Sequence, residues 1–415
     1  MPIGRWTLPA ILLAAFAIRV LPLALPFEFS GPDTASYLDP AIRLAAGQGL
    51  TLPDGSPAIG RPPGYAAFLA ALFLLAGGPA LGLVQAAQAA LGALCAWCVH
   101  RTLAREGEPV ALLGAGLVAL DPVSAGQSPF ILREALLQGL VALVVALLLG
   151  RGRWRHPLAG LALVGLALTH QLYVLLGPFL ALADLLAART RRARLLRLAR
   201  WTATGVLVAL AVHLWARRNE VALERAGLPP RYALTLADNA VPARELWLSA
   251  TYDTWWLSGD FATGFQANAW REERALMDRL GLEGTKAEMY RRTAELWREH
   301  PLRTLARNLR LNAWYWLEIP GAVRLAEHPR LQVVRWALLP WHWVRLTCAA
   351  AGLVWLWRSG RWRLHAPVVG VVAFFLVAPA PLYPVPRYLG PAIPVLCLLA
   401  AHGLAASLRR REARA

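Results

Sequence analysis

The chain has 415 residues, of which 57% are hydrophobic, with 18 tryptophans and a formal net charge of +18. Apolar runs recur along most of it, and several approach the roughly 20 residues that cross a bilayer core of about 30 Å. The basic residues cluster in short segments between these runs, so the charge reports membrane topology and argues against nucleic-acid binding. The four cysteines lie in apolar runs and do not make a disulfide framework or a zinc site.

The first apolar run, residues 8–26, contains Arg19 and lacks a small-x-small cleavage site, which favours a retained helix over a signal peptide. An acidic stretch with Asp33 and Asp39 follows it. Because Pro40 comes next, we expect the helix here to be interrupted and Asp39 to cap a second short helix.

Charge in the connecting loops sets the predicted topology. Residues 64–77 form an apolar helix of only about 14 residues, too short to span without help. If this helix does not cross, the Arg-rich run 189–200 and the C-terminal tail fall on the same side as Arg5, which is then cytoplasmic. Ten spans result, with both termini inside, at about 8–26, 81–100, 109–122, 134–150, 157–171, 172–188, 201–216, 335–357, 364–380 and 389–408.

The sequence therefore predicts an all-α polytopic membrane protein in three parts. Residues 1–216 form an N-terminal transmembrane module, which includes a first external loop at 27–80. Residues 217–334 form a long external segment with helical spacing, and long translocated loops are exempt from the charge bias. Residues 335–415 supply the C-terminal transmembrane helices.

Ionisable and aromatic side chains gather at the membrane boundaries of the predicted external face. Ionisable groups near a bilayer are costly unless they are paired or solvated, so their convergence indicates a polar cavity that opens at this leaflet. Acids together with arginines suit a substrate with a phosphate to neutralise and a hydroxyl to deprotonate. The group consists of Asp33, Asp39, Arg61, Glu134, Arg387 and Tyr388.

Several short motifs then occur in a specific order. "PDTASYLDPAIRLAAGQGL" precedes "GRPPGYAAFLAALFLLAG", and "ALDP…SPFILREALL", "HPLRTLARNLRLNAWYW" and "PRYLGPAIPVLCLLAAHGL" follow. Together they resemble the bacterial GT-C membrane glycosyltransferases, which include protein O-mannosyltransferases, aminoarabinose transferases and rhizobial lipopolysaccharide glycosyltransferases. The resemblance is strongest in residues 31–77 and implies a GT-C-type bundle of about ten transmembrane helices with external amphipathic helices.

The resemblance implies transfer of a sugar from a polyprenyl-phosphate donor, with inversion, on the periplasmic face of a bacterial inner membrane. The acceptor would be lipid A or another glycan, a protein or a lipid. Asp33 matches the first-loop acid that acts as general base, and a carboxylate within reach of the acceptor hydroxyl can take its proton. The alternative is that Asp33 only caps the helix that starts at Thr34.

The resemblance also implies phosphate contacts. Arg61 matches a basic residue that touches the carrier phosphate, and a fixed guanidinium stabilises the charge that develops there. Arg387 and Tyr388 match an Arg-Tyr pair that would make a second contact. Each of these residues is equally explained as an interfacial anchor that meets lipid headgroups.

The remaining candidate residues are assigned to substrate binding. Tyr37 lies one turn after Asp33, and Glu134 matches an acid that lines the family's cavity, although a salt bridge to Arg133 would explain it as well. Asp39 is assigned an assisting role. Thr34 stands where the family often has a second acid or Ser, so no cofactor is expected, although a divalent metal is left open.

Two other functions remain as alternatives. A flippase or transporter for lipid-linked sugars would place charged or broken helices through the membrane midplane. An O-antigen-type polysaccharide polymerase would also have Arg-rich external loops, but would not need the order of Asp33, Tyr37 and the Arg-Pro-Pro motif at Arg61.

Overall fold

The computed structural model describes residues 6–24, 29–30, 33–228, 241–251, 264–320, 332–382 and 386–412. Almost all of these residues are helical, and the described part contains no β-strand, only an isolated bridge between Thr51 and Pro57. The predicted all-α class is therefore confirmed. Within the predicted external segment 217–334, residues 229–240, 252–263 and 321–331 lie outside the described ranges.

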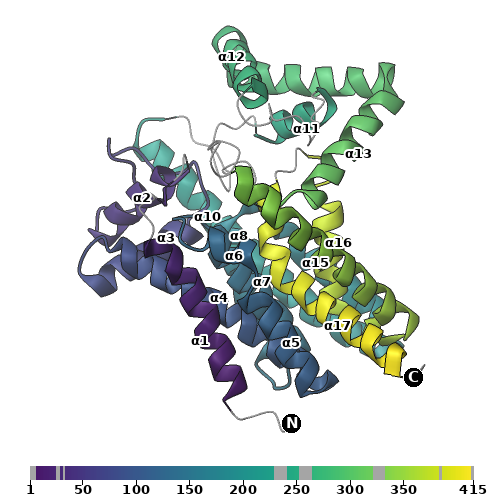
Figure 1. Cartoon of the computed structure of the whole chain (residues 1–415). Helices are drawn as coiled ribbons and strands as arrows, with labels where there is room; N and C mark the ends of the chain where they lie inside the picture. Colours follow the sequence, from purple (N-terminus) through teal and green to yellow (C-terminus); the bar gives the residue numbers. More distant parts are fainter. Residues whose placement is uncertain are drawn as a thin grey trace. The chain divides into compact units, whose positions relative to one another are not determined.

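The chain divides into two compact units, of which the first comprises residues 1–236, 345–373 and 391–415. This unit holds the C-terminal part of α15 (Gln332–Arg358) and most of α16 (Ala366–Val377). Its other helices, shown in Figure 1, are α1 (Thr7–Val20), α2 (Ala35–Ala45), α3 (Gly64–Ala76), α4 (Leu81–Leu103), α5 (Glu108–Ala119), α6 (Pro122–Gln127), α7 (Glu134–Leu149), α8 (Arg155–Thr169), α9 (Leu176–Ala187), α10 (Arg191–Arg225) and α17 (Ile393–Glu412).

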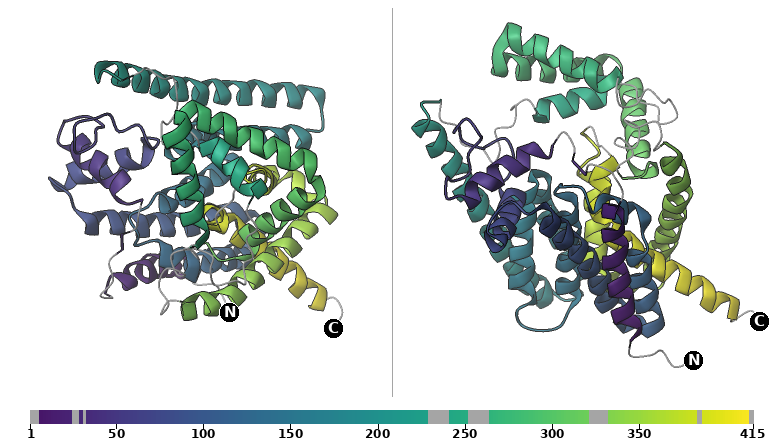
Figure 2. Two further views of the ribbon diagram at one scale, coloured as in Figure 1. Left: turned by 90° about the horizontal axis from the view of Figure 1, so that it is seen from above. Right: turned by 60° about the vertical axis from the view of Figure 1, so that its left-hand side comes forward.

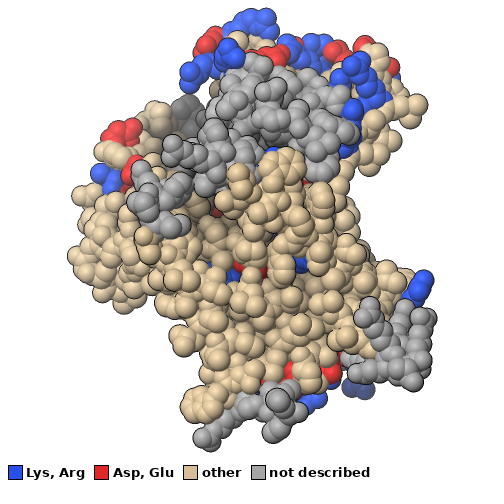
Figure 3. All heavy atoms as spheres, viewed as in Figure 1, with Lys and Arg blue, Asp and Glu red and all other residues tan. Residues whose placement is uncertain are grey.

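A helix occupies each of the ten predicted spans, which confirms the polytopic helical fold. Five helical stretches of the described chain are long and apolar enough to cross a membrane by length and composition, namely Thr7–Ala24, Leu81–Glu106, Glu108–Gln127, Arg191–Arg225 and Pro386–Leu408. Shorter apolar helices, including α3, α7 and α16, add to them. Figure 3 shows that uncharged side chains cover most of the middle of the molecule on the face in view, as a lipid-facing surface requires.

The helices of the first unit are packed closely, and charged side chains occur inside the bundle. A Cβ at Gly352 of α15 would meet the carbonyl oxygen of Leu399 at 1.9 Å, so glycine lets α15 approach α17, as is typical of membrane helices. The guanidinium of Arg19 donates to the carbonyl oxygens of Ala15, Val118 and Ala119 at 2.9–3.2 Å and to Ser124 Oγ at 3.1 Å. Arg19 is therefore paired within the bundle.

The two ends of the first unit differ in what they carry. Figures 1 and 2 show α2 and α3 beside the end of the bundle where α1 finishes. The start of α1 and the end of α17 both lie at the opposite end (Figure 1).

The second unit comprises residues 237–344 and 374–390. It contains α11 (Val241–Thr251), α12 (Gly264–Glu299, kinked at Gly281) and α13 (Pro301–Leu317). These helices share a small apolar core formed by Ala243, Trp247, Leu248, Leu276, Met289 and Leu311. The described part of the predicted external segment is thus mainly helical, with a core of its own.

Candidate functional site

Helix α2 carries the candidate residues of the first loop. Tyr37, Pro40 and Ala41 are buried on the side of α2 that contacts α3, and Asp33 lies just before the helix. The predicted interruption at Pro40 is wrong, because α2 runs without a break from Ala35 to Ala45. Proline removes one backbone hydrogen bond there, but its side chain is buried.

The motif "GRPPGY" holds the start of α3 in place. A Cβ at Gly64 would lie 2.5 Å from Thr169 Oγ1 and 2.8 Å from the carbonyl oxygen of Leu168, so only glycine allows α3 to begin against the end of α8. Pro62 and Pro63 restrict the backbone directly before this contact. Arg61 is therefore fixed at the mouth of α3, close to the start of α2.

Asp33 and Arg61 form an ion pair across 28 residues of sequence. Arg61 Nη2 donates to Asp33 Oδ1 at 2.7 Å, with the two side chains 33% and 21% exposed, respectively. The capping residue of α2 is Thr34, and no side chain caps the described start of this helix. The Asp33 carboxylate thus binds a guanidinium, an arrangement that capping alone does not explain.

Tyr37 lies beneath this ion pair. The Arg61 Cζ atom is 5.5 Å from the centroid of the Tyr37 ring, and the Arg133 Cζ atom is 5.9 Å from it. Burial raises the pKa of the Tyr37 phenol; the charges of Arg133 and Arg61 act to lower it, and those of Glu134 and Asp33 to raise it further. Four charged side chains of both signs therefore converge on one neutral phenol.

The segment before α7 brings Glu134 and Arg133 to this place, and hydrogen bonds from α4 hold it there. Gln88 Nε2 donates to the carbonyl oxygens of Ser128 at 2.6 Å and Phe130 at 2.9 Å. The Tyr65 hydroxyl of α3 donates to Gln88 Oε1 at 2.6 Å. One glutamine thus ties α3 and α4 to the segment that leads to α7.

Sequence reasoning did not assign Arg133, Gln88 or Tyr65 to the site. A signal was present for Gln88, because it lies with Gln85 in an otherwise apolar span, where polar side chains are costly. Gln85 Nε2 donates to the carbonyl oxygen of Pro129 at 3.1 Å, so both amides hold the same segment.

Asp39 is not brought to the Asp33–Arg61 pair, and two further candidates belong to the other unit. Asp39 lies two residues after Tyr37, which turns it to another side of α2, and its carboxylate makes no hydrogen bond or ion pair with the described residues. Arg387 and Tyr388 belong to the second unit, where the Arg387 guanidinium lies 5.5 Å from the Tyr388 ring centroid. Their predicted role as a second phosphate contact stays a prediction.

His170, at the end of α8, has a structural role. Its Nδ1 accepts a hydrogen bond from the backbone N–H of Leu172 at 3.2 Å, at the start of the short helix Gln171–Leu175. This contact caps the turn that joins α8 to α9.

The site, as the first unit presents it, contains a half-buried carboxylate paired with a half-buried guanidinium. A buried phenol, a second acid and a second arginine support this pair. A partly exposed guanidinium can exchange its carboxylate for a phosphate, since both anions accept its hydrogen bonds. The carboxylate released in this way can accept a proton.

Comparison with known proteins identifies the fold. No protein-family model matches the chain, and no curated protein sequence matches it. Among solved structures, the oligosaccharyltransferase AglB from Archaeoglobus fulgidus matches with a TM-score of 0.58 in a complex with Zn and sulfate. It matches with a TM-score of 0.55 in a complex with an inhibitory peptide and a dolichol-phosphate.

Both AglB matches have 14% sequence identity and cover 98% of this chain, which spans about half the length of AglB. ArnT from Cupriavidus metallidurans bound to undecaprenyl phosphate matches with a TM-score of 0.45 and 16% identity, over 97% of this chain and 78% of ArnT. AglB and ArnT are GT-C membrane glycosyltransferases. The predicted resemblance to this superfamily is therefore confirmed at the level of the fold.

Proposed function

We propose that this membrane protein with a GT-C fold transfers a sugar from a polyprenyl-phosphate donor to a hydroxyl group of an acceptor, with inversion. The observation that carries the proposal is the 2.7 Å ion pair between Asp33 and Arg61, held over Tyr37. It combines a proton acceptor and a phosphate-binding group in one place. The chemistry of glycosyl transfer from a lipid phosphate needs both.

The proposed reaction begins when the donor phosphate takes the place of Asp33 on Arg61. The acceptor oxygen attacks the anomeric carbon opposite the phosphate, and its proton passes to the Asp33 carboxylate. The bond between the anomeric carbon and the phosphate oxygen breaks, and the polyprenyl phosphate departs with the electron pair. Arg61, with Arg133 nearby, stabilises the negative charge that develops on it.

Glu134 has a supporting role in this proposal. Its side chain is buried at the start of α7, and its charge acts on Tyr37 from a different element than that of Asp33. A buried carboxylate in this position is suited to hold hydroxyl groups of the sugar or the acceptor. This role of Glu134 applies to a glycan, a protein or a lipid acceptor and does not select among them.

We place the reaction on the periplasmic face of a bacterial inner membrane, because the Arg-rich loops at the opposite end of the first unit follow the positive-inside rule. The flippase alternative requires charges free to guide a phosphate through the bundle. The charges inside the bundle are instead engaged by protein groups: Arg19 by carbonyl oxygens and Ser124, and Asp121 by Arg345. This favours transfer over transport.

The test uses the full chain, purified and reconstituted in nanodiscs. Undecaprenyl-phosphate-linked hexoses and pentoses are supplied one at a time with a lipid A acceptor, a peptide or a glycan, and mass spectrometry follows undecaprenyl phosphate and the glycosylated product. For Asp33→Asn we expect a loss of about 10²- to 10⁴-fold in transfer, the usual contribution of a general base.

Asp54→Asn is the matched control for this experiment. Asp54 lies in the same loop, and its carboxylate accepts only local hydrogen bonds, from the backbone N–H and the hydroxyl of Ser56. We expect Asp54→Asn to transfer at the wild-type rate. Wild-type transfer by Asp33→Asn would remove Asp33 as the base.

A further inference from the structure

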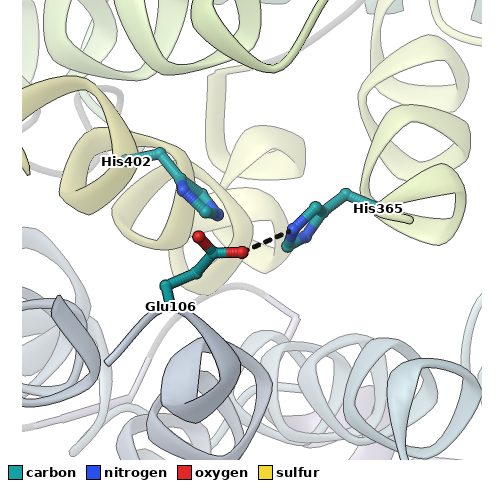
Figure 4. Close-up of side chains that lie close together, drawn as sticks. All are labelled: Glu106, His365 and His402. Atoms are coloured by element: carbon teal, nitrogen blue, oxygen red, sulfur yellow. Dashed lines mark hydrogen bonds and ion pairs between the residues drawn. The ribbon is translucent and has the colours of Figure 1, made fainter. Parts of the chain in front are cut away.

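Two histidines and a glutamate converge at the end of the first unit that carries the chain termini. Glu106 lies in the short helix Ala104–Glu106 after α4, His365 directly precedes α16, and His402 belongs to α17. Figure 4 shows the three side chains directed toward one another from these separate segments. His365 and His402 are buried, and Glu106 is a half-buried residue whose side chain is only 3% exposed. Glu106 follows the C-terminal end of α4, whereas α3 and Arg61 precede its N-terminal end.

The ligand atoms of this cluster lie close enough together for three side chains to reach one metal ion. The ligand atoms of Glu106, His365 and His402 lie within 4.8 Å of one another. His365 Nε2 is 3.4 Å from Glu106 Oε1. Two ligands at about 2.0–2.2 Å from a tetrahedral zinc ion are separated by about 3.3–3.5 Å, so this pair already has the required spacing.

The surroundings orient the ligands as metal sites do. The Trp355 ring stacks on the His402 ring with centroids 5.4 Å apart, which fixes the plane of the imidazole. The rings of His365 and His402 are 4.9 Å apart and nearly perpendicular, so that both can direct a nitrogen to one point.

Arg361 forms an ion pair with the carboxylate of Glu106. Its Nη2 donates to Oε1 and its Nη1 lies beside Oε2, both at 2.8 Å. The guanidinium remains partly exposed, so it can turn to solvent when a cation takes its place. It therefore acts as an internal competitor, which neutralises the buried carboxylate when no cation is bound.

We propose that Glu106, His365 and His402 bind a divalent transition-metal ion of the zinc class, with water in the fourth position. Imidazole and carboxylate ligands in this combination suit zinc. The ion would join the short helix after α4, the start of α16 and the middle of α17, and Glu106 and His365 are 259 residues apart in sequence. The inference is independent of the proposed glycosyl transfer.

Zinc alone is the probe that tests this site. The full chain in nanodiscs is stripped with a chelator and dialysed against zinc, and elemental analysis gives the number of ions per chain. We expect one ion per chain for the wild type, and loss of this ion in Glu106→Gln, His365→Gln and His402→Gln. Absence of a stoichiometric ion in the wild type, or its retention in both histidine variants, would overturn the proposal.

His100→Gln is the matched control. His100 Nε2 lies 3.0 Å from Glu108 Oε1. This histidine–glutamate pair does not belong to the cluster of Glu106, His365 and His402. We expect this variant to keep its zinc ion. Loss of the ion in His100→Gln, with wild-type behaviour of the other variants, would move the site elsewhere and contradict the assignment.

Two further measurements do not depend on the folding of the ligand variants. Cobalt(II) bound to the wild type should give the visible absorption of a tetrahedral site, which zinc abolishes; an octahedral spectrum would count against the proposal. Arg361→Gln removes the competing charge, so we expect zinc to bind about tenfold more tightly. Unchanged or weaker binding would refute the role of Arg361 as competitor.

Discussion

Two of the aspartate–arginine pairs in the first unit differ sharply in burial, and the difference separates a structural contact from a candidate site. Asp121 and Arg345 bond inside the bundle with side chains 0% and 3% exposed. Asp33 and Arg61 bond at the end of the bundle with side chains 21% and 33% exposed. Of these two pairs, only the second has access to a ligand.

Burial also sets what each pair contributes to stability. Removing one partner of a buried pair costs about 3–5 kcal/mol, because the other charge is left without compensation. An exposed pair contributes about 0–1 kcal/mol. Substitution of Arg345 should therefore mainly lower the stability of the fold, and substitution of Arg61 should mainly weaken substrate binding.

The largest expected effect on stability belongs to Arg345→Ala. Asp121 would lose its guanidinium while its Oδ1 still accepts from the backbone N–H of Ser124, so we expect a loss of about 3–5 kcal/mol in the free energy of unfolding. The measurement is the thermal midpoint and the yield of monodisperse protein in detergent.

The double variant Asp121→Asn/Arg345→Met is the control for this prediction. It removes both charges and keeps the capping oxygen, so we expect it to be more stable than Arg345→Ala. Equal stability of the single variant and the wild type would mean that the two pairs do not differ as their burial indicates.

A smaller loss of stability is expected for Gly92→Ala. A Cβ at Gly92 would meet Arg19 Nε at 2.1 Å, so the added methyl group displaces a guanidinium that four oxygen atoms hold. Overpacking of this kind costs about 1–3 kcal/mol. Gly116→Ala in α5 is the control, because no atom lies within 4 Å of its Cβ position; a similar loss there would show that the effect is not steric.

The third prediction is that Gly64→Ala lowers both the stability of the protein and its transfer activity. The new methyl group would push the start of α3 from α8, at a cost of about 1–3 kcal/mol, and would shift Arg61 with it. We expect transfer to decrease more than tenfold, since a displacement of about 1 Å in a positioning element has effects of this size. Gly60→Ala, with open space around its Cβ, should transfer normally, and a defect there would contradict this explanation.

The fold and part of the site were accessible from the sequence for different reasons. Hydropathy located a helix at each predicted span, because the bilayer fixes the length and composition of a crossing helix. The order of motifs in residues 31–77 singled out Asp33 and Arg61 as separate candidates, and their 2.7 Å contact was not predicted. Helix α2 differed from expectation, because it accommodates Pro40, whose side chain is buried, without a break.

Contacts between distant segments were not accessible. Arg345 bonds Asp121 across 224 residues, and no spacing rule connects them. Glu106 and His365 are 259 residues apart, so their proximity follows only from the tertiary fold, in which α4 packs against α17. Gln88 was detectable as a polar residue in an apolar span, but its partners were not.

The smallest expected effect on stability is that of Arg61→Ala, and it sharpens the comparison most directly. Because the pair with Asp33 is exposed, we expect the free energy of unfolding to change by no more than about 1 kcal/mol. Because the guanidinium would hold the donor phosphate, the apparent KM for the undecaprenyl-phosphate sugar should rise about tenfold or more.

Arg43→Ala is the matched control. Arg43 lies on α2 and donates to Thr51 Oγ1 at 2.8 Å, and both the free energy of unfolding and the apparent KM should stay near wild type. If Arg61→Ala instead lowered stability as much as Arg345→Ala and left KM unchanged, the Asp33–Arg61 pair would be a structural contact like the buried one, and the proposed site would lose its phosphate-binding group.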